Sequence, residues 1–275
     1  MPYAENGTAR LHWQERGSGT PLLLVMGHSL SSALWYAAEE VLAQQHRVIT
    51  FDNRGTGKSS KVRRISVADM ARDAFAVLDA AGVESAHVYG VSLGGGIVLE
   101  MARQRPERIR SLVLGCTLAK TPDLPGVPSY LHPLLHLPAP LLARLLKARQ
   151  GAPTDNPHGT RATPERIAEQ QTYVAAEAFD VKTSGEQTKA IDAYSIEVDE
   201  VRALRMPALV LHGDEDTAVA YASGVRLHEL IAHSEMLTMP GAGHNYFLAA
   251  ADEANACVLD FLSRADALAT ADQAR

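Results

Sequence analysis

Continuous apolar runs alternate with segments of helical periodicity along most of this chain. The runs are short and uninterrupted, which is typical of strands buried on both faces of a parallel sheet. Apolar positions at helical spacing follow most of these runs. The predicted strands are residues 22–26, 48–51, 88–89, 109–115, 208–212 and 235–239, and the predicted helices are residues 32–45, 66–81, 95–105, 223–231 and 252–268.

Repeated strand–helix units of this kind predict an α/β fold, in which a mostly parallel twisted sheet carries helices on both faces. Residues 3–15 alternate apolar and polar side chains around Asn6-Gly7, which predicts two antiparallel strands joined by a tight turn. Ser32 and Ser66 are suited to cap the helices predicted after them, and Gly82 is suited to end the second.

The alternation stops between residues 118 and 203. This stretch is rich in proline and predicts loops with helices at 139–149, 164–178 and 185–194. Ligands of open α/β sheets bind at the carboxyl ends of the strands, where such an insert would lie. We therefore expect a core made of residues 1–117 and 204–275, and a mainly helical cap made of residues 118–203.

A G-x-S-x-G sequence, Gly90-Val91-Ser92-Leu93-Gly94, lies between a predicted strand and a predicted helix. Strand, G-x-S-x-G and helix in this order are the context of a nucleophile elbow. The tight turn needs glycine at its flanking positions, and it places the Ser92 hydroxyl at a helix N-terminus, whose dipole favours negative charge nearby. A serine that only caps the helix is the alternative interpretation.

A serine hydroxyl becomes a good nucleophile only when a base takes its proton, and an acid must fix the tautomer of that base. Asp214, Glu215 and Asp216 follow the predicted strand 208–212, and His244 lies in a glycine-rich loop after the strand 235–239. Serine, acid and histidine thus occur in the order of one established triad arrangement. Asp214 could instead brace a loop or cap a helix, and Glu215 is expected to face solvent. For His244, the alternative to a catalytic base is a loop histidine that is hydrogen-bonded only to backbone.

The motifs LLLVMG, FDNRGTGKS, GVSLGG, RSLVLGC, LVLHGDED and GAGH occur in this order over nearly the whole chain. With them the chain resembles α/β-hydrolase-fold serine hydrolases, and its motifs are similar to those of enol-lactone hydrolases and of methyl esterases of bacterial secondary metabolism. The resemblance implies a catalytic triad of Ser92, Asp216 and His244, because the family's acid follows the strand-end glycine by three positions. The proline often found four positions after that acid is Ala220 here.

The resemblance also implies an oxyanion hole made of two backbone N–H groups. One belongs to Leu93, which follows the nucleophile. The family's second donor follows a His-Gly dipeptide after the third strand. Because this chain has Met26-Gly27 at that place, the donor is expected to be the N–H of His28. The side chain of His28 is open to a pocket role or to a structural or solvent-facing role.

Two further motifs suggest ligands but lack required residues. Residues 56–59 (TGKS) end like a phosphate-binding loop, yet Asp52 stands where the opening glycine is needed. Asp52 and Arg54 are instead expected to brace neighbouring loops. His132 and His136 lie four residues apart in HPLLH, without the glutamate of a metalloprotease motif and without an evident third ligand. We therefore expect no metal site.

Composition narrows the range of partners. The 275 residues are 46% hydrophobic with a net charge of -6, which allows one large core and gives no sign of nucleic-acid or anionic membrane binding. The N-terminus lacks the pattern of a signal peptide, and no apolar run approaches the length of a membrane span. Cys116 and Cys257 are interpreted as buried thiols of a reducing compartment. We expect a cytoplasmic monomer or homodimer.

The chemistry expected from these residues is hydrolysis of a small, largely apolar carboxylic ester or lactone through an acyl-enzyme, with no cofactor. Candidate pocket residues are Gly27, Trp35, Leu135 and Tyr246, although Trp35 and many leucines of residues 134–146 also suit the core. The same triad could instead catalyse hydrolysis of a carbon–carbon bond or perhydrolysis, because this fold hosts many reactions. A ligand receptor that uses the hydrolase pocket without turnover is a third possibility.

Overall fold

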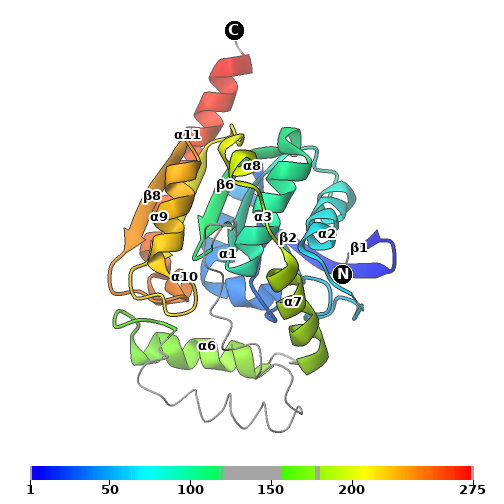
Figure 1. Cartoon of the computed structure of the whole chain (residues 1–275), viewed down its shortest axis with the longest axis vertical. Coiled ribbons are helices and arrows are strands. Elements are labelled where there is room, and N and C mark those ends of the chain that lie inside the picture. The colour runs from blue at the N-terminus through cyan, green and yellow to red at the C-terminus, as the bar shows by residue number, and fades with distance from the viewer. Residues whose placement is uncertain (1, 63, 118, 120–156, 177–179, 274–275) are drawn as a thin grey trace.

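A twisted sheet forms the centre of the computed structural model (Figure 1), which describes residues 2–62, 64–117, 119, 157–176 and 180–273. Within this part of the chain the sheet has eight strands in the order β1-β2-β4-β3-β5-β6-β7-β8. Strand β2 is antiparallel to β1 and β4, and the other neighbours are parallel. The strands are β1 Tyr3–Asn6, β2 Ala9–Arg16, β3 Thr20–Val25, β4 His46–Phe51, β5 Ala86–Val91, β6 Ile109–Gly115, β7 Ala208–Gly213 and β8 Ser234–Met239. This confirms the predicted fold class.

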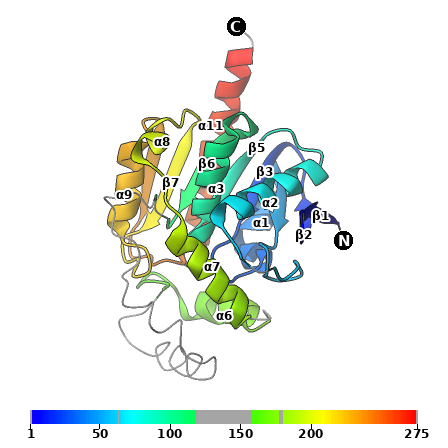
Figure 2. The ribbon, with the colours of Figure 1, turned by 45° about the vertical axis from the view of Figure 1, so that its right-hand side comes forward.

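Helices cover both faces of the sheet (Figures 1 and 2). One layer holds α2 (Val67–Ala80), α3 (Leu93–Gln104), α8 (Val198–Arg202) and α9 (Tyr221–Leu230), which contact one another in that order. The other holds α1 (Tyr36–Leu42), α10 (Tyr246–Ala249) and α11 (Ala251–Gln273), which also contact one another. The sheet is therefore buried on both sides, as its uninterrupted apolar strands require.

The core is split by the sheet into two apolar clusters. Leu23 and Val25 of β3 belong to the cluster under α2 and α3, whereas Leu22 and Leu24 belong to the cluster under α1 and α11. This alternation follows from the two-residue period of a strand, which points successive side chains to opposite faces. The last four residues of β3, 22–25, are fully buried.

Several predicted helix ends differ from those in the structure. The first helical segment is capped by Ser31, whose side chain accepts from the Ala33 N–H, and it begins as a 3-10 turn over Ser32–Trp35. Ser32 is not the cap, because its hydroxyl donates to the buried carboxylate of Asp52 at 2.7 Å. The prediction for Ser66 is confirmed: its hydroxyl oxygen accepts from the Asp69 N–H at 3.1 Å, at the start of α2. Gly82 follows this helix with a φ of 68°.

Two helices of the insert lie across the carboxyl edge of the sheet (Figures 1 and 2). Helix α6 spans Pro164–Ala176, and α7 spans Val181–Ala193, beginning four residues before its predicted start because Asp180 caps it. The short helices α8 and α10 were not predicted. The predicted helix 139–149, the leucine-rich run 134–146 with the candidate Leu135, and His132 and His136 lie outside the described residues.

The two cysteines differ in burial. Cys116 is fully buried at the end of β6, as predicted. Cys257 is only partly buried on α11, so the prediction of a buried thiol is wrong at that position. Helix α11 presents part of its circumference to solvent, and residue 257 lies at the margin of its apolar face.

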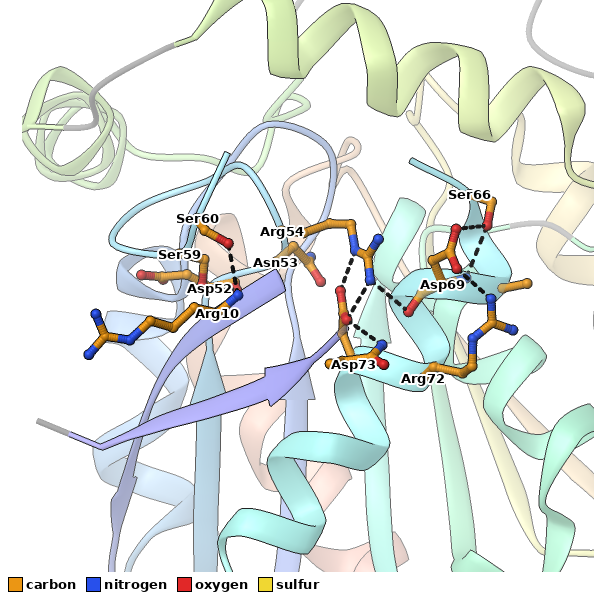
Figure 3. A network of polar contacts seen from close by, with 12 residues as sticks. Arg10, Asp52, Asn53, Arg54, Ser59, Ser60, Ser66, Asp69, Arg72 and Asp73 are labelled. Atoms are coloured by element: carbon orange, nitrogen blue, oxygen red, sulfur yellow. Dashed lines mark hydrogen bonds and ion pairs between the residues drawn. The ribbon is translucent and has the colours of Figure 1, made fainter. Parts of the chain in front are cut away.

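A buried ion pair ties the loop after β4 to helix α2 (Figure 3). The guanidinium of Arg54 donates to Asp73 through Nε at 2.5 Å and through Nη2 at 2.6 Å. The Asn6 side chain adds a third donor to Asp73 at 2.8 Å. In the same loop, the Lys58 N–H donates to Asp52 at 2.8 Å. The expectation that Asp52 and Arg54 brace loops is confirmed.

We expect Asp73→Ala to lower the free energy of unfolding by about 3–5 kcal/mol, because it leaves the Arg54 guanidinium buried without its counter-charge. Urea denaturation followed by circular dichroism measures this loss. Asp260→Ala is the matched control, since Asp260 pairs with Arg264 on the exposed face of α11. An exposed pair of this kind contributes less than about 1 kcal/mol. Equal losses in both variants would contradict the argument.

Candidate active site

Ser92 occupies a strained turn between β5 and α3. Its φ is 56° and its ψ is -122°, a conformation that residues with a side chain rarely adopt. The turn is possible because a Cβ at Gly90 would overlap the Gly94 carbonyl, and a Cβ at Gly94 would overlap the Val25 carbonyl. The Ser92 N–H donates to the Gly115 carbonyl at 2.9 Å, which holds the turn against β6. This is the geometry of a nucleophile elbow.

Asp216 and His244 come together at the ends of neighbouring strands. His244 Nδ1 lies 2.8 Å from Asp216 Oδ2, at the carboxyl ends of β8 and β7. The other carboxylate oxygen of Asp216 accepts the N–H groups of Ala218 and Val219, both at 2.8 Å. Burial raises the pKa of Asp216, but the hydrogen bonds from His212 and His244 outweigh it and hold that pKa well below its usual range.

The two acids beside Asp216 have other partners. Asp214 accepts the Gly241 N–H at 2.7 Å, which braces the loop that leads to His244. Glu215 is exposed and accepts both the N–H and the hydroxyl of Thr160, at 2.7 and 2.8 Å. Of these three acids, the structure therefore brings Asp216 to His244.

His244 also interacts with Cys116. Burial lowers the pKa of His244, but its interactions with Cys116 and with the Asp216 carboxylate outweigh it and raise that pKa above its ordinary value. Cys116 directly follows Gly115, whose carbonyl accepts the Ser92 N–H. His244 and Ser92 thus both adjoin the short segment 115–116. Among the described residues, no hydrogen bond joins the Ser92 hydroxyl to the His244 ring.

The loop after β3 lies against the elbow. A Cβ on Gly27 would be 3.2 Å from the Ser92 Cβ, so the backbone of residue 27 approaches the serine closely. Ser29 has a φ of 62°, and its N–H donates to Gln187 Oε1 at 2.7 Å. No hydrogen bond from the His28 N–H occurs among the described residues.

The His28 side chain binds the insert. Its Nε2 lies 3.0 Å from the Ser184 carbonyl, to which it donates, and 3.1 Å from Thr188 Oγ1. Burial lowers the pKa of His28 below its ordinary value, against the opposing effect of the hydrogen bond to Ser184. Of the two alternatives open for this side chain, the structural one is favoured, because His28 joins the loop after β3 to helix α7.

Helix α7 contributes residues that sequence reasoning missed. Gln187 is fully buried, and its amide donates to the Arg54 carbonyl at 3.4 Å while accepting from Ser29. A Cβ on Gly55 would overlap Thr183, so α7 packs closely on the loop after β4. No local signal reveals these contacts, because a glutamine inside α7 has nothing in its own segment that marks it as buried.

Two of the candidate pocket residues lie in the core. Trp35 is fully buried, with its ring centroid 4.9 Å from that of Tyr89 and 5.6 Å from that of Phe247. Tyr246 is also fully buried, and its hydroxyl lies 2.9 Å from that of Tyr89. These placements do not support either residue as a pocket contact. Gly27 alone of the described candidates lies against Ser92.

His212 is another residue of this region that was not singled out. It is the last residue but one of β7 and contacts Asp216 from the side opposite the loop backbone donors. A polar residue at the end of a buried strand was the available signal. Among the described residues, no group of three or more His, Cys, Asp or Glu side chains is placed to hold a metal ion. None of the described helices has the length and apolar character needed to cross a bilayer.

We expect Asp216→Asn to lower the pKa of His244 by about 1–3 units, because it removes the carboxylate charge beside Nδ1. Nitrogen-15 NMR of labelled histidine, followed against pH, measures this change. Asp214→Asn is the control and leaves the pKa of His244 in place, since Asp214 binds the Gly241 backbone. The opposite pattern would identify Asp214 as the partner acid.

The raised pKa of His244 also predicts how the stability of the protein depends on pH. A folded-state pKa above the unfolded value of about 6.5 stabilises the protein fully below that pH, and this contribution is lost as the pH rises through the folded value. Asp216→Asn should therefore flatten the dependence of the unfolding free energy on pH in that range.

Comparison with known proteins supports the architecture. RutD of Azorhizobium caulinodans, which carries the provisional name of a carbamate hydrolase, is 47% identical over 115 residues, or 42% of this chain and 43% of that protein. The 2-hydroxymuconate semialdehyde hydrolase of Pseudomonas sp. (strain CF600) is 29% identical over 94% of this chain and 93% of its own length.

Similarity in structure extends over almost the whole chain. The enol-lactonase of Burkholderia xenovorans LB400 superposes with a TM-score of 0.80 over 95% of this chain and 100% of its own, at 22% sequence identity. The family model for the alpha/beta hydrolase fold matches residues 20–251. The match takes in every strand of the sheet except β1 and β2 and includes the elbow, Asp216 and His244. This chain belongs to the alpha/beta hydrolase fold family.

Proposed function

We propose that this protein is a cofactor-free serine hydrolase that cleaves a small carboxylic ester or lactone. One observation carries the proposal: a strained serine at the strand–helix turn lies at the same sheet edge as a histidine bonded at 2.8 Å to a buried carboxylate. Ser92 is the nucleophile, His244 the base and Asp216 the acid that orients it. Leu93 and His28 provide the backbone donors of the oxyanion hole.

Acylation begins when Ser92 Oγ attacks the carbonyl carbon and its proton passes to Nε2 of His244. The negative charge of Asp216 stabilises the imidazolium that forms, and its contact with Nδ1 keeps the free lone pair on Nε2. The carbonyl oxygen becomes an oxyanion and accepts the N–H groups of Leu93, the first residue of α3, and of His28. His244 then protonates the leaving oxygen, and the acyl-enzyme remains.

Deacylation repeats these steps with water. His244 takes a proton from the water molecule while the water oxygen attacks the acyl carbon, and it returns a proton to Ser92 as the acid product leaves. In this mechanism a raised pKa of His244 lowers the rate near neutral pH, because only the neutral ring accepts a proton. Activity is therefore expected to rise with pH as His244 deprotonates.

We further propose that residues 118–203 form a cap over this site. Its helices α6 and α7 lie across the edge of the sheet that carries Ser92 and His244 (Figure 2). A substrate enclosed in this way would be a small, largely apolar molecule. The two free thiols fit a cytoplasmic protein.

A second candidate is hydrolysis of a carbon–carbon bond with the same residues. The relative named 2-hydroxymuconate semialdehyde hydrolase favours it, because that protein aligns over nearly the full chain. A panel of short p-nitrophenyl esters, lactones and vinylogous diketones separates the two. Higher kcat/KM on the esters or lactones supports the first candidate, whereas turnover confined to the diketones selects the second.

We expect Ser92→Ala to lower kcat for p-nitrophenyl acetate by roughly 10⁴- to 10⁶-fold, because the triad acts as a unit. The variant should also lose covalent labelling by a fluorophosphonate, detected by mass spectrometry. Ser263→Ala, on the exposed face of α11, is the matched control and keeps both. Wild-type rates in Ser92→Ala would refute the proposed function.

A further inference from the structure

We propose that His212 is a positioning residue for Asp216: its Nε2–H holds the Oδ2 atom that faces His244. This inference rests on the proposed function, because it concerns the acid of the proposed triad. His212 is the residue before Gly213 at the carboxyl end of β7, and both its side chain and that of Asp216 are fully buried.

Two contacts fix the orientation of the His212 ring. Its Nε2 lies 2.9 Å from the Val219 carbonyl and 3.2 Å from Asp216 Oδ2. A carbonyl oxygen only accepts hydrogen bonds, so Nε2 must carry the hydrogen. The same nitrogen is within hydrogen-bond distance of both oxygens. His212 therefore donates to the same carboxylate oxygen that receives Nδ1 of His244 at 2.8 Å.

The other ring nitrogen shows that this histidine acts as a neutral donor. Among the described residues, His212 Nδ1 is buried and has no hydrogen-bond partner. Gly224 of α9 closes off that side of the ring, where an added Cβ would be 2.5 Å from Nδ1. A proton on Nδ1 would be a buried N–H without an acceptor, which is costly. The ring is thus held as the Nε2–H tautomer.

The Asp216 carboxylate consequently has four donors. Ala218 and Val219 bind Oδ1 through their N–H groups, and His212 and His244 bind Oδ2. The backbone donors hold Oδ1, and within the described part of the chain His212 is the side chain that contacts Oδ2 besides His244. Hydrogen bonds to a carboxylate favour its charged form. His212 therefore keeps Asp216 ionised and moderates how strongly Oδ2 attracts a proton on His244.

Other charged or titratable groups near this pair have partners elsewhere. Tyr221 of α9 meets the His212 ring edge-on at 5.9 Å between centroids, and its hydroxyl binds Thr238 at 2.6 Å. Asp214 and Glu215 bind the Gly241 N–H and Thr160. Cys116 interacts with His244, and its N–H donates to the Leu211 carbonyl. Replacing His212 thus changes its contact with Asp216 and its hydrogen bond to the Val219 carbonyl.

The test compares His212→Met with His212→Gln. The two side chains have similar length and volume, but only glutamine retains an N–H donor at its end. In His212→Met, the Asp216 carboxylate loses a hydrogen-bond donor, so its negative charge is less stabilised. The His244–Asp216 pair therefore binds its proton at a higher pH, whichever of the two residues holds it. We expect the acid limb of kcat/KM for p-nitrophenyl acetate to move up by on the order of one pH unit. His212→Gln keeps a donor, so its acid limb should stay close to that of the wild type.

Labelled-histidine nitrogen-15 NMR gives a readout that needs no substrate. In His212→Met the titration of His244 moves in the same direction as the rate profile. In the wild type, the His212 resonances report an Nε2–H tautomer. An Nδ1–H tautomer in the wild type overturns the inference, even where a variant fails to fold.

A purely structural role for His212 predicts a different result. His212→Met would then lose activity by the same factor at every pH, with the titration of His244 unchanged, and this outcome overturns the inference. Full activity of Ser92→Ala would defeat the proposed function instead, while the NMR titration would still decide whether His212 acts on the Asp216–His244 pair.

Discussion

A carboxylate that leaves water must be surrounded by hydrogen-bond donors, and this requirement organises the carboxyl edge of the sheet. Three aspartates at or near that edge are buried: Asp52, Asp73 and Asp216. Asp52 accepts from Ser32 and Lys58, which join the loops after β3 and β4. Asp73 receives Arg54 from the loop after β4 (Figure 3). Hydrogen bonds to these carboxylates therefore hold the loops at this edge in place. Losing a donor would leave a buried charge unpaired, which costs much free energy of folding.

The insert is joined to the same framework. Gln187 of α7 binds both the loop after β3, at the Ser29 N–H, and the loop after β4, at the Arg54 carbonyl. His28 adds a second bond between the loop after β3 and α7, to the Ser184 carbonyl. The His28 N–H, which is proposed to stabilise an oxyanion, thus lies in a loop that α7 binds at two points. These are the His28 side chain and the Ser29 N–H. Substrate enclosure and oxyanion stabilisation would depend on the same helix.

The chemistry proposed here follows from where strain and charge are placed. Ser92 is held at a φ of 56°, a strain that the contacts of Gly90 and Gly94 with neighbouring backbone make tolerable. His244 lies between an acid and a thiol, both of which raise its pKa against the effect of burial. The alpha/beta hydrolase fold explains why these residues meet at one edge, but the reaction depends on the site itself.

What the sequence by itself determined was local: the strands, most of the helices, the elbow around Ser92, and an acid and a histidine after the last two strands. These features depend on residues close together in the chain, so turn, capping and periodicity preferences reveal them. Parallel connectivity then implied that the strand ends would meet at one edge. The resemblance implies Asp216 as the acid, but the residues alone left Asp214 open. The tertiary structure places Asp216 against His244 and Asp214 against the Gly241 N–H. It also decided that Trp35 and Tyr246 belong to the core and that Gln187 binds Ser29, 158 residues away. Contacts across such distances arise from packing between whole elements, for which no short segment carries a signal.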